Sequence, residues 1–225
     1  MVIESILFII GGYLLGSVSA AYLAGKWIGG KDLRQYGSGN LGGSMVWEHV
    51  SPVAAIVAGV YDLIKAALPT WLALQVGLPV AVAVAAGLAA VAGHCWSIFL
   101  GFTGGRGLLS YFGLMLLVFF PWGAVWLAGL AVFGHFAFRD SAPFALAGLV
   151  TMPLLSYLTG GPEIMLPLSA AMLVLALAKR LEANRRPLPP DRERWKVLLR
   201  RAVFDRDIAD HQAWIDQQPE IDVEG

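Results

Sequence analysis

Residues 2–24 read VIESILFIIGGYLLGSVSAAYLA, and this stretch decides the class of fold. Glu4 is its only charged residue, and about 20 mostly apolar residues are enough for a helix to cross a bilayer. A cleaved signal peptide would carry basic residues ahead of its apolar core, whereas this stretch begins with an acid. We therefore expect a retained membrane-spanning helix.

Similar apolar runs continue along most of the chain. Of its 225 residues, 57% are hydrophobic and 14% are charged, against about 25% charged in an ordinary soluble domain. Pro121 marks either a break between two spans or a kink within one. The candidate spans are residues 2–24, 52–75, 78–93, 108–120, 122–138, 143–158 and 164–178. The sequence thus predicts an all-α, polytopic membrane protein with about seven transmembrane helices.

Basic residues follow every second candidate span. They are Lys26, Lys31 and Arg34 after the first, Arg106 after the third, Arg139 after the fifth, and Lys179 and Arg180 after the seventh. The connections near residues 77, 121 and 160 contain no Lys or Arg. Because cytoplasmic loops are rich in Lys and Arg, this alternation predicts an N-terminus outside the cell and a C-terminus in the cytoplasm.

The composition changes after residue 186, which divides the chain into a membrane domain (1–186) and a cytoplasmic tail (187–225). Pro187, Pro189 and Pro190 mark the boundary. Apolar and basic residues at helical spacing predict a basic amphipathic helix over about residues 191–206. Such a helix lies either on the anionic lipid surface or against the protein's own loops. The acidic sequence from Asp207 onward predicts a disordered end.

Two glycine-rich segments interrupt the apolar pattern on the deduced cytoplasmic side. They are GSGNLGGS (residues 37–44) and GFTGGRG (residues 101–107), the second of which follows His94. Glycine lets backbone N–H groups approach a ligand closely, and successive N–H groups form anion-binding concavities. Arg106 adds a cation, and His94 adds a group that titrates near neutrality. The pattern predicts a phosphate cradle, and the alternative is that these glycines serve tight turns or close helix packing.

Asp62 and Lys65 lie three residues apart within an apolar span, so they can pair on one helix face. Charges within membrane segments are costly, and they are functional or paired inward. Both a functional site and a structural ion pair between helices therefore stay open. Cys95 is the single cysteine, which excludes an intramolecular disulfide and a cysteine-rich metal site.

Together these segments resemble the bacterial acyl-phosphate-dependent glycerol-3-phosphate acyltransferases, the PlsY family. Residues 36–42 (YGSGNLG) are similar to the family's first cytoplasmic motif. Asp62 and Lys65, followed by Pro69, resemble its Asp-x-x-Lys-Gly-x-x-Pro element. Residues 93–94 (GH) and 104–107 (GGRG) resemble its Gly-His and Gly-Gly-Lys-Gly motif. Order and spacing agree, and the resemblance covers about residues 1–186.

The resemblance implies a bundle of seven membrane helices in the bacterial inner membrane. It implies transfer of a fatty acyl group from acyl phosphate to the sn-1 hydroxyl of glycerol-3-phosphate, or of a related phosphorylated polyol. The products would be lysophosphatidic acid and phosphate. Beyond these substrates and membrane lipids, it implies no metal, no organic cofactor and no nucleic-acid partner.

The resemblance also indicates which residues form the site. The expected catalytic residues are Ser38, His94 and Arg106. The expected substrate- and phosphate-binding residues are Gly37, Gly39, Asn40, Gly42, Ser44, Lys65, Gly104, Gly105, Gly107, Arg180 and Asn184.

Several positions depart from the family's pattern. They are Met45 for Asn, Glu48 for Arg, Ala66 for Gly, Ser97 for Pro, Arg106 for Lys, Arg180 for His, and Asn184 displaced by one position. A carboxylate such as Glu48 repels a bound phosphate. These departures motivate a second hypothesis, a catalytically impaired paralogue that binds lipid or acyl phosphate, or interacts with a partner. A third, a small transporter, would need a polar path at the bilayer midplane, for which Asp62 and Lys65 are the only good candidates.

Overall fold

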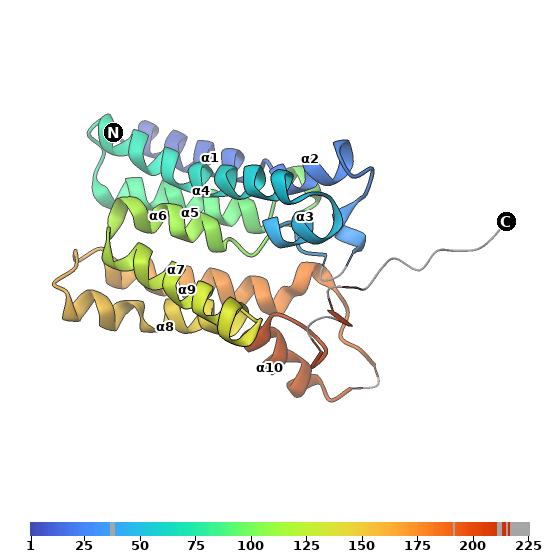
Figure 1. Ribbon diagram of the computed structural model, residues 1–225. Coiled ribbons are helices and arrows are strands. Elements are labelled where there is room, and N and C mark those ends of the chain that lie inside the picture. Colours follow the sequence, from blue (N-terminus) through green and yellow to red (C-terminus); the bar gives the residue numbers. More distant parts are fainter. Residues whose placement is uncertain (37–38, 191, 211–212, 215, 217–225) are drawn as a thin grey trace.

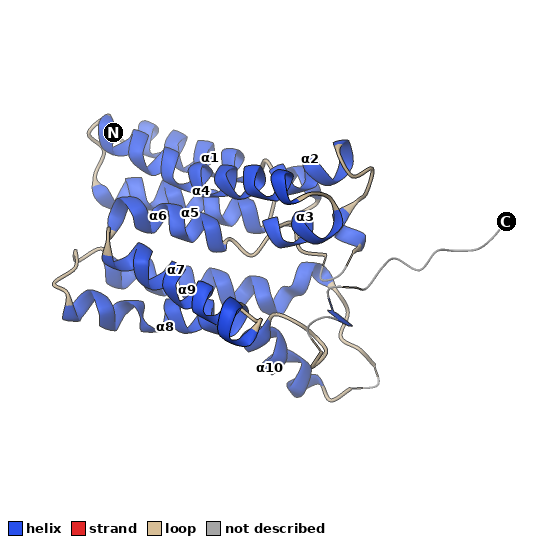
Figure 2. Ribbon diagram, in the orientation of Figure 1, coloured by secondary structure: helices blue, strands red, loops and turns tan. Residues whose placement is uncertain are grey.

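The computed structural model describes residues 1–36, 39–190, 192–210, 213–214 and 216. Within these ranges the chain is helical and contains no β-strand (Figure 2), as expected for the all-α class. The α-helices are α1 (Val2–Ser17), α2 (Ala20–Trp27), α3 (Gly43–His49), α4 (Pro52–Gln75), α5 (Val80–Cys95), α6 (Leu108–Val118), α7 (Trp122–Phe138), α8 (Ala142–Leu158), α9 (Met165–Glu182) and α10 (Arg194–Phe204). The 3-10 turns are η1 (Leu33–Gln35), η2 (Ile98–Leu100) and η3 (Ala183–Arg185).

The long helices run side by side between two ends of one bundle (Figure 1). The stretch Val2–Trp27 and helix Pro52–Gln75 are long and apolar enough to cross a membrane, and α5 to α8 are shorter apolar helices. Helix α6 ends at Val118 and α7 begins at Trp122, so Pro121 lies in a break between two helices rather than in a kink. The seven predicted spans thus correspond to α1 with α2, and to α4 through α9.

The first predicted span is not one continuous helix, which corrects the expectation for residues 2–24. The backbone is extended at Val18 (φ −72°, ψ 117°) and at Ser19 (φ −103°, ψ 103°). The Ser19 hydroxyl then accepts a hydrogen bond from the Tyr22 N–H at 3.2 Å and so caps α2. A helix start of this kind is typical of serine.

Side chains from other elements satisfy the carbonyl groups that this break exposes. Tyr61 Oη donates to Leu15 O at 3.4 Å, and Ser97 Oγ donates to Ser17 O at 2.6 Å. Lys65 Nζ donates to Val18 O at 3.3 Å. The buried lysine of α4 therefore helps to end α1, a structural role that the sequence left open.

Small residues bring α1 and α5 into close contact, as is common between membrane helices. A Cβ added at Gly12 or Gly16 would overlap the carbonyl oxygens of Ala86 and Ala90 on α5. A Cβ at Gly93 would overlap the carbonyl oxygen of Tyr13 on α1 in the same way. These glycines are therefore required for packing. On the far side of the bundle, large apolar residues such as Tyr111, Met115 and Met152 fill the core.

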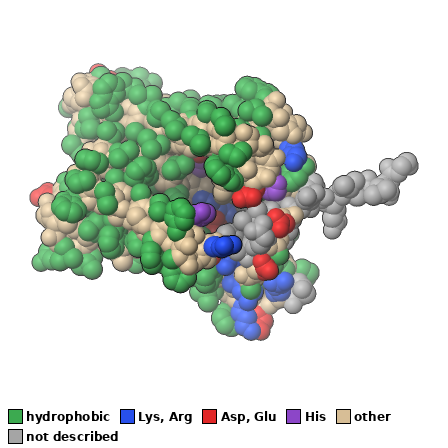
Figure 3. All heavy atoms as spheres, in the orientation of Figure 1, with side chains coloured by type: hydrophobic (Ala, Val, Ile, Leu, Met, Phe, Trp, Pro, Cys, Tyr) green, Lys and Arg blue, Asp and Glu red, His purple; other side chains and the backbone are tan. Residues whose placement is uncertain are grey.

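Charge is distributed unevenly between the two ends of the bundle. Figure 3 shows most Lys, Arg, Asp and Glu side chains gathered where α2, α3 and α10 lie, while the sides are largely hydrophobic. The connections between α4 and α5, α6 and α7, and α8 and α9 meet at the opposite end (Figure 1). The glycine-rich segments lie at the charged end: the first leads into α3, and the second lies between α5 and α6.

The expected C-terminal helix forms as α10, which is shorter than the predicted 191–206. One face of α10 packs against the ends of α8 and α9, and Val197 and Arg201 are buried there. The Arg201 guanidinium forms an ion pair with Asp207 and donates to the carbonyls of Leu181, Arg186 and Pro187. On this face the helix therefore packs against the protein's own chain.

Candidate functional site

The two glycine-rich segments contact each other at the charged end of the bundle. The Leu41 N–H donates to Gly104 O at 3.4 Å, although the two residues belong to different segments. The N–H of Gly105 donates to His94 O at 3.0 Å, which fixes the second segment on the end of α5. The described parts of the two segments are therefore in contact with each other.

Asn184, in the turn after α9, joins both segments through its side chain. Its Nδ2 donates to Gly39 O at 2.9 Å and to Gly104 O at 3.0 Å. Its Oδ1 accepts from Gly104 N at 3.1 Å and from Lys179 Nζ at 2.6 Å. A carboxamide has two donor hydrogens and an oxygen with two lone pairs, so these four hydrogen bonds use its full capacity.

The glycines of the second segment allow it to pack closely on His94. A Cβ at Gly104 would overlap His94 O, and a Cβ at Gly105 would overlap the His94 ring. Gly107 has φ +78° and precedes the first residue of α6. Close packing, the alternative left open for these glycines, therefore accounts for Gly104 and Gly105 in the structure.

Behind the second segment lies a buried cluster of Asp62, Lys65 and His94. Lys65 Nζ is 2.8 Å from Asp62 Oδ1, and the exposed fractions of both residues are 3% or less. His94 Nδ1 lies 3.3 Å from the same oxygen, but without the geometry of a hydrogen bond to any described residue. The Ser110 hydroxyl donates to Asp62 O at 2.9 Å. The charges expected within the membrane are thus paired inward.

Arg106 points toward the C-terminal segment. Its Nε lies 2.8 Å from Asp205 Oδ2, and its Nη1 donates to Lys179 O at 3.2 Å. Lys179 is fully buried, pairs with Glu182 at 3.0 Å and lies over the Trp96 ring. The cation expected to bind phosphate is therefore balanced by a carboxylate from beyond α10.

Arg180 attaches α10 to the bundle. Its Nη1 donates to the carbonyls of Ala202 and Val203 at 2.9 and 3.1 Å, and its Nη2 donates to Ala142 O at 2.7 Å. These acceptors belong to the end of α10 and the beginning of α8. The guanidinium thus binds three backbone carbonyls, none of which belongs to a glycine-rich segment.

The first segment is described only in part, because Gly37 and Ser38 lie outside the described residues. Gly39 has φ +65°, and a Cβ there would lie 3.8 Å from Arg186 Nε. Asn40 is half-buried next to Gly42, whereas Ser44 is exposed in the first turn of α3. Arg186 thus reaches the segment from the chain that follows α9.

The departures at α3 and at the α5–α6 connection have distinct surroundings. Met45 is buried in an apolar cluster with Leu33 and Leu41, whereas Glu48 is exposed. The Ser97 N–H donates to Thr103 O at 3.2 Å. A proline at position 97 has no N–H to form this bond, so the structure gives a reason for the serine.

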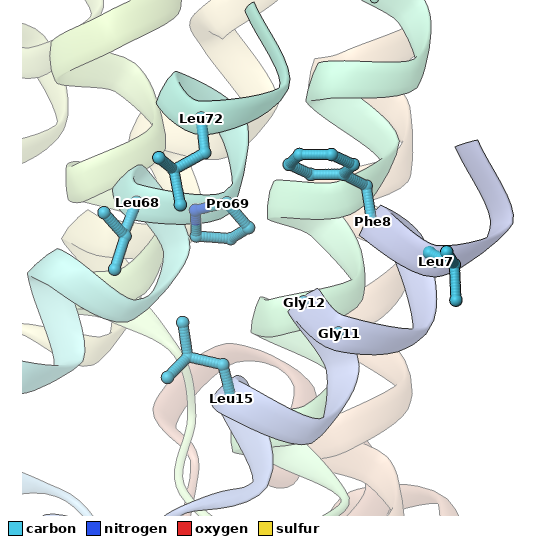
Figure 4. Close-up of a pocket in the computed structure, with 8 residues that line it drawn as sticks. All are labelled: Leu7, Phe8, Gly11, Gly12, Leu15, Leu68, Pro69 and Leu72. Carbon is cyan, nitrogen blue, oxygen red and sulfur yellow. The ribbon is translucent and has the colours of Figure 1, made fainter. Parts of the chain in front are cut away.

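An apolar groove lies between α1 and α4, within the membrane-spanning part of the bundle. Its volume is about 290 Å³, and Figure 4 shows Leu7, Phe8, Leu15, Leu68, Pro69 and Leu72 around it, with Gly11 and Gly12 on α1. Leu68 is one helical turn from Lys65 on α4, so the groove ends close to the buried cluster.

Three residues of this region were not identified as site residues from the sequence: Lys179, Arg186 and Asp205. In the sequence Lys179 marks a cytoplasmic connection and the start of the last family-like motif, and Arg186 and Asp205 are common residue types in a charged segment. Burial lowers the pKa of Arg186 below its usual value, and the nearby Asp207 carboxylate opposes this effect. Across the described ranges, no three His, Cys, Asp or Glu side chains gather in a way that could hold a metal ion.

Comparisons with known proteins agree with this architecture. The chain matches the family described as glycerol-3-phosphate acyltransferase over residues 6–188. A glycerol-3-phosphate acyltransferase of Parasynechococcus marenigrum (strain WH8102) is 37% identical over 182 residues, which are 78% of this chain and 83% of that one. Glycerol-3-phosphate acyltransferase 5 of Dehalococcoides mccartyi (strain ATCC BAA-2266 / KCTC 15142 / 195) is 32% identical over 222 residues, 94% of this chain and 93% of that one.

The solved structures that match are those of PlsY (YgiH), an integral membrane glycerol 3-phosphate acyltransferase. The structure of its glycerol 3-phosphate form is 26% identical to this chain, with a TM-score of 0.71. The match covers 81% of this chain and 91% of the PlsY chain. Its lysophosphatidic acid form, at 23% identity and a TM-score of 0.69, supports the likeness of fold. The chain therefore belongs to the glycerol-3-phosphate acyltransferase family and is an integral membrane acyltransferase.

Proposed function

We propose that the protein transfers a fatty acyl group from acyl phosphate to the sn-1 hydroxyl of glycerol-3-phosphate or of a related phosphorylated polyol. The hydroxyl oxygen attacks the acyl carbonyl carbon, and a new ester C–O bond forms. The C–O bond to the phosphate breaks, and the hydroxyl proton leaves with the phosphate or passes to water. The products are lysophosphatidic acid and inorganic phosphate. The main observation in favour is the contact between two glycine-rich segments at the charged end of the bundle.

Both substrates carry phosphate, so a site for them needs N–H donors and cations. The two segments supply backbone N–H groups, and Arg106, Lys179 and Arg186 lie around them. Because acyl phosphate is already activated, the protein mainly has to orient the two substrates and stabilise the charge on the carbonyl oxygen. No metal or organic cofactor enters this proposal.

The residues expected in the site fall into three groups in this proposal: those that contact substrate, those that position the segments, and those that have structural roles. By resemblance, Ser38 hydrogen-bonds the substrate, while Asn40 and the N–H groups near it hold phosphate. The packing of His94 against Gly105 supports a role in positioning the second segment. The buried ion pair of Lys65 and the backbone contacts of Arg180 favour structural roles for these two residues.

The apolar groove between α1 and α4 supports a substrate with a long acyl chain. It is lined by apolar side chains (Figure 4), and those of Leu7, Leu68 and Leu72 are exposed on the outside of the bundle. We place the acyl chain of the donor here, with its phosphate toward the charged end. In the same proposal, the N-terminus lies outside and the C-terminus lies on the cytoplasmic side of the inner membrane.

The experiment measures phosphate release from a long-chain acyl phosphate by the purified protein in lipid nanodiscs. We expect release that depends on glycerol-3-phosphate, formation of lysophosphatidic acid, and a large loss of rate in Ser38→Ala. A long-chain acyl-coenzyme A serves as the control donor and should not be consumed. If acyl phosphate binds but is not consumed with glycerol-3-phosphate or related phosphorylated polyols, the proposal is wrong and the impaired-paralogue hypothesis is favoured.

A further inference from the structure

Helix α10 has an apolar stripe that the described part of the protein leaves uncovered. Trp195, Leu198 and Leu199 lie at the spacing of one helix face, and their exposed fractions are 61%, 38% and 55%. Val197 and Arg201, on the other side of the helix, are buried against the bundle. The exposed part of the helix therefore includes an apolar stripe, which is unfavourable in water.

The attachments of α10 place this stripe at the level where the membrane helices end. Arg180 ties the last turn of α10 to the first residue of α8, and Arg106 pairs with Asp205 directly after the helix. Arg206 forms a second ion pair with Asp140, at 2.6 Å, just before α8. Figure 1 shows α10 at the charged end, next to α8 and away from the centre of the bundle.

Basic residues flank the apolar stripe. At about 100° per residue, Arg194 and Lys196 fall on opposite sides of it. Both are exposed, and Arg200 is half-buried on the side of Lys196. The one acid within this stretch, Glu193, forms an ion pair with Lys196. The exposed face therefore combines apolar side chains with a net positive charge.

We propose that this face of α10 is seated in the head-group layer of the same membrane, with anionic lipid as its partner. Trp195, Leu198 and Leu199 enter the boundary between head groups and acyl chains, and the flanking cations contact lipid phosphates. Charge complementarity, together with the attachment of α10 to the beginning of the apolar helix α8, favours lipid over a protein partner. The inference does not depend on the acyltransferase activity.

The test uses a nitroxide spin label at Leu199→Cys, in full-length protein reconstituted in nanodiscs. Native Cys95 is fully buried and should not be labelled, which the unmutated protein checks. The control is Glu193→Cys, at the exposed residue directly before the first residue of α10. With anionic lipid, we expect the label at 199 to be severalfold more accessible to oxygen, which partitions into lipid, than to a water-soluble nickel complex. The label at 193 should show the reverse.

A second comparison separates anionic lipid from other occupants of this face. The protection of label 199 from nickel should fall severalfold in purely zwitterionic nanodiscs, and also when Arg194, Lys196 and Arg200 are all changed to Gln. Equal nickel access at 199 and 193 would overturn the proposal. Protection that is the same with and without anionic lipid would overturn the choice of partner. Protection that depends on the number of protein copies per disc would identify a second copy instead.

Discussion

Asn184 has no hydrogen-bonding capacity left for a substrate, because Gly39, Gly104 and Lys179 use both its donors and its oxygen. The resemblance implied that this residue contacts substrate or phosphate. Asn184 lies one residue away from the position of the family's Asn, so its side chain can have a role other than contact with substrate. We infer that it is a positioning residue, which holds two backbone segments that are far apart in the sequence.

We predict that Asn184→Ala lowers kcat/KM by more than tenfold and lowers stability. Gly39 O and Gly104 N–H lose the Asn184 side chain as partner, whereas Gly104 O keeps the Leu41 N–H. Each buried group left unsatisfied costs about 1–3 kcal/mol. The measurements are steady-state kinetics and thermal unfolding in the same detergent. Asn184→Asp keeps the acceptor for Gly104 N–H and Lys179, so it should be less damaging. Full activity of Asn184→Ala would refute the positioning role.

In the proposed function, Asp205 competes with a substrate phosphate for Arg106. We predict that Asp205→Asn lowers the KM for glycerol-3-phosphate, because the guanidinium charge is no longer balanced. An ion pair such as Arg106–Asp205 contributes about 1 kcal/mol. Removing it is therefore expected to lower the KM about fivefold. Asp140→Asn removes the neighbouring ion pair with Arg206 and is the matched control. An unchanged or higher KM in Asp205→Asn, relative to this control, would contradict the prediction.

The sequence could not predict these side-chain partners. Arg106 and Asp205 are 99 residues apart, and Asn184 and Gly39 are 145 apart. No local pattern connects them, because their contact depends on how the membrane helices pack. The residue types of the site followed from glycine-rich motifs, but the partner of each cation required the structure.

At the scale of elements, long apolar runs were enough to predict the membrane helices. The break between α1 and α2 was missed because Val18 and Ser19 continue an apolar stretch, and the groups that satisfy it come from α4 and from Ser97. Helix α3 was missed as well, since its first residues belong to a glycine-rich segment. The local pattern of apolar residues thus predicted that the helices exist, whereas tertiary contacts determine where some of them begin and end.

The groove between α1 and α4 leads to a prediction about chain length. A Cβ at Gly11 meets no atom within 4 Å, so Gly11→Leu can fold and project into the groove. Displacing about two methylenes of a bound acyl chain costs ~1.6 kcal/mol. We therefore expect the KM for long-chain acyl phosphates to rise about tenfold, with little change for short ones.

The control for the groove is Gly129→Leu on α7, which also has open space around it. This variant adds the same side chain to the lipid-facing surface and should leave the kinetics unchanged at every chain length. Equal effects of the two substitutions, or an equal effect of Gly11→Leu on short and long donors, would exclude this groove as the acyl site.

At the scale of the whole molecule, the alternation of basic residues indicated that all cation-rich connections share one end. The structure gathers charged side chains at that end (Figure 3). It also brings the described parts of the two glycine-rich segments into contact. Hydropathy and charge therefore predicted the general layout, because a bilayer allows few arrangements of apolar helices.

The orientation of the bundle in the membrane can be tested with single cysteines. In intact cells, Gly160→Cys, between α8 and α9, should react with a membrane-impermeant maleimide. Ser44→Cys, at the charged end, should react only after the cells are opened. Buried Cys95 provides the unlabelled background. The reverse labelling pattern would show that the N-terminus is cytoplasmic.

The link from Asn184 back to Gly39 and Gly104 also bears on how the protein is made. A ribosome completes both glycine-rich segments long before it reaches residue 184. Until the seventh span has entered the bilayer and the next turn has emerged, nothing supplies the carboxamide that joins them. A nascent chain arrested before that turn would therefore be inserted in the membrane but inactive in the proposed reaction. The contact between the two glycine-rich segments would be completed only after all the membrane helices had been made.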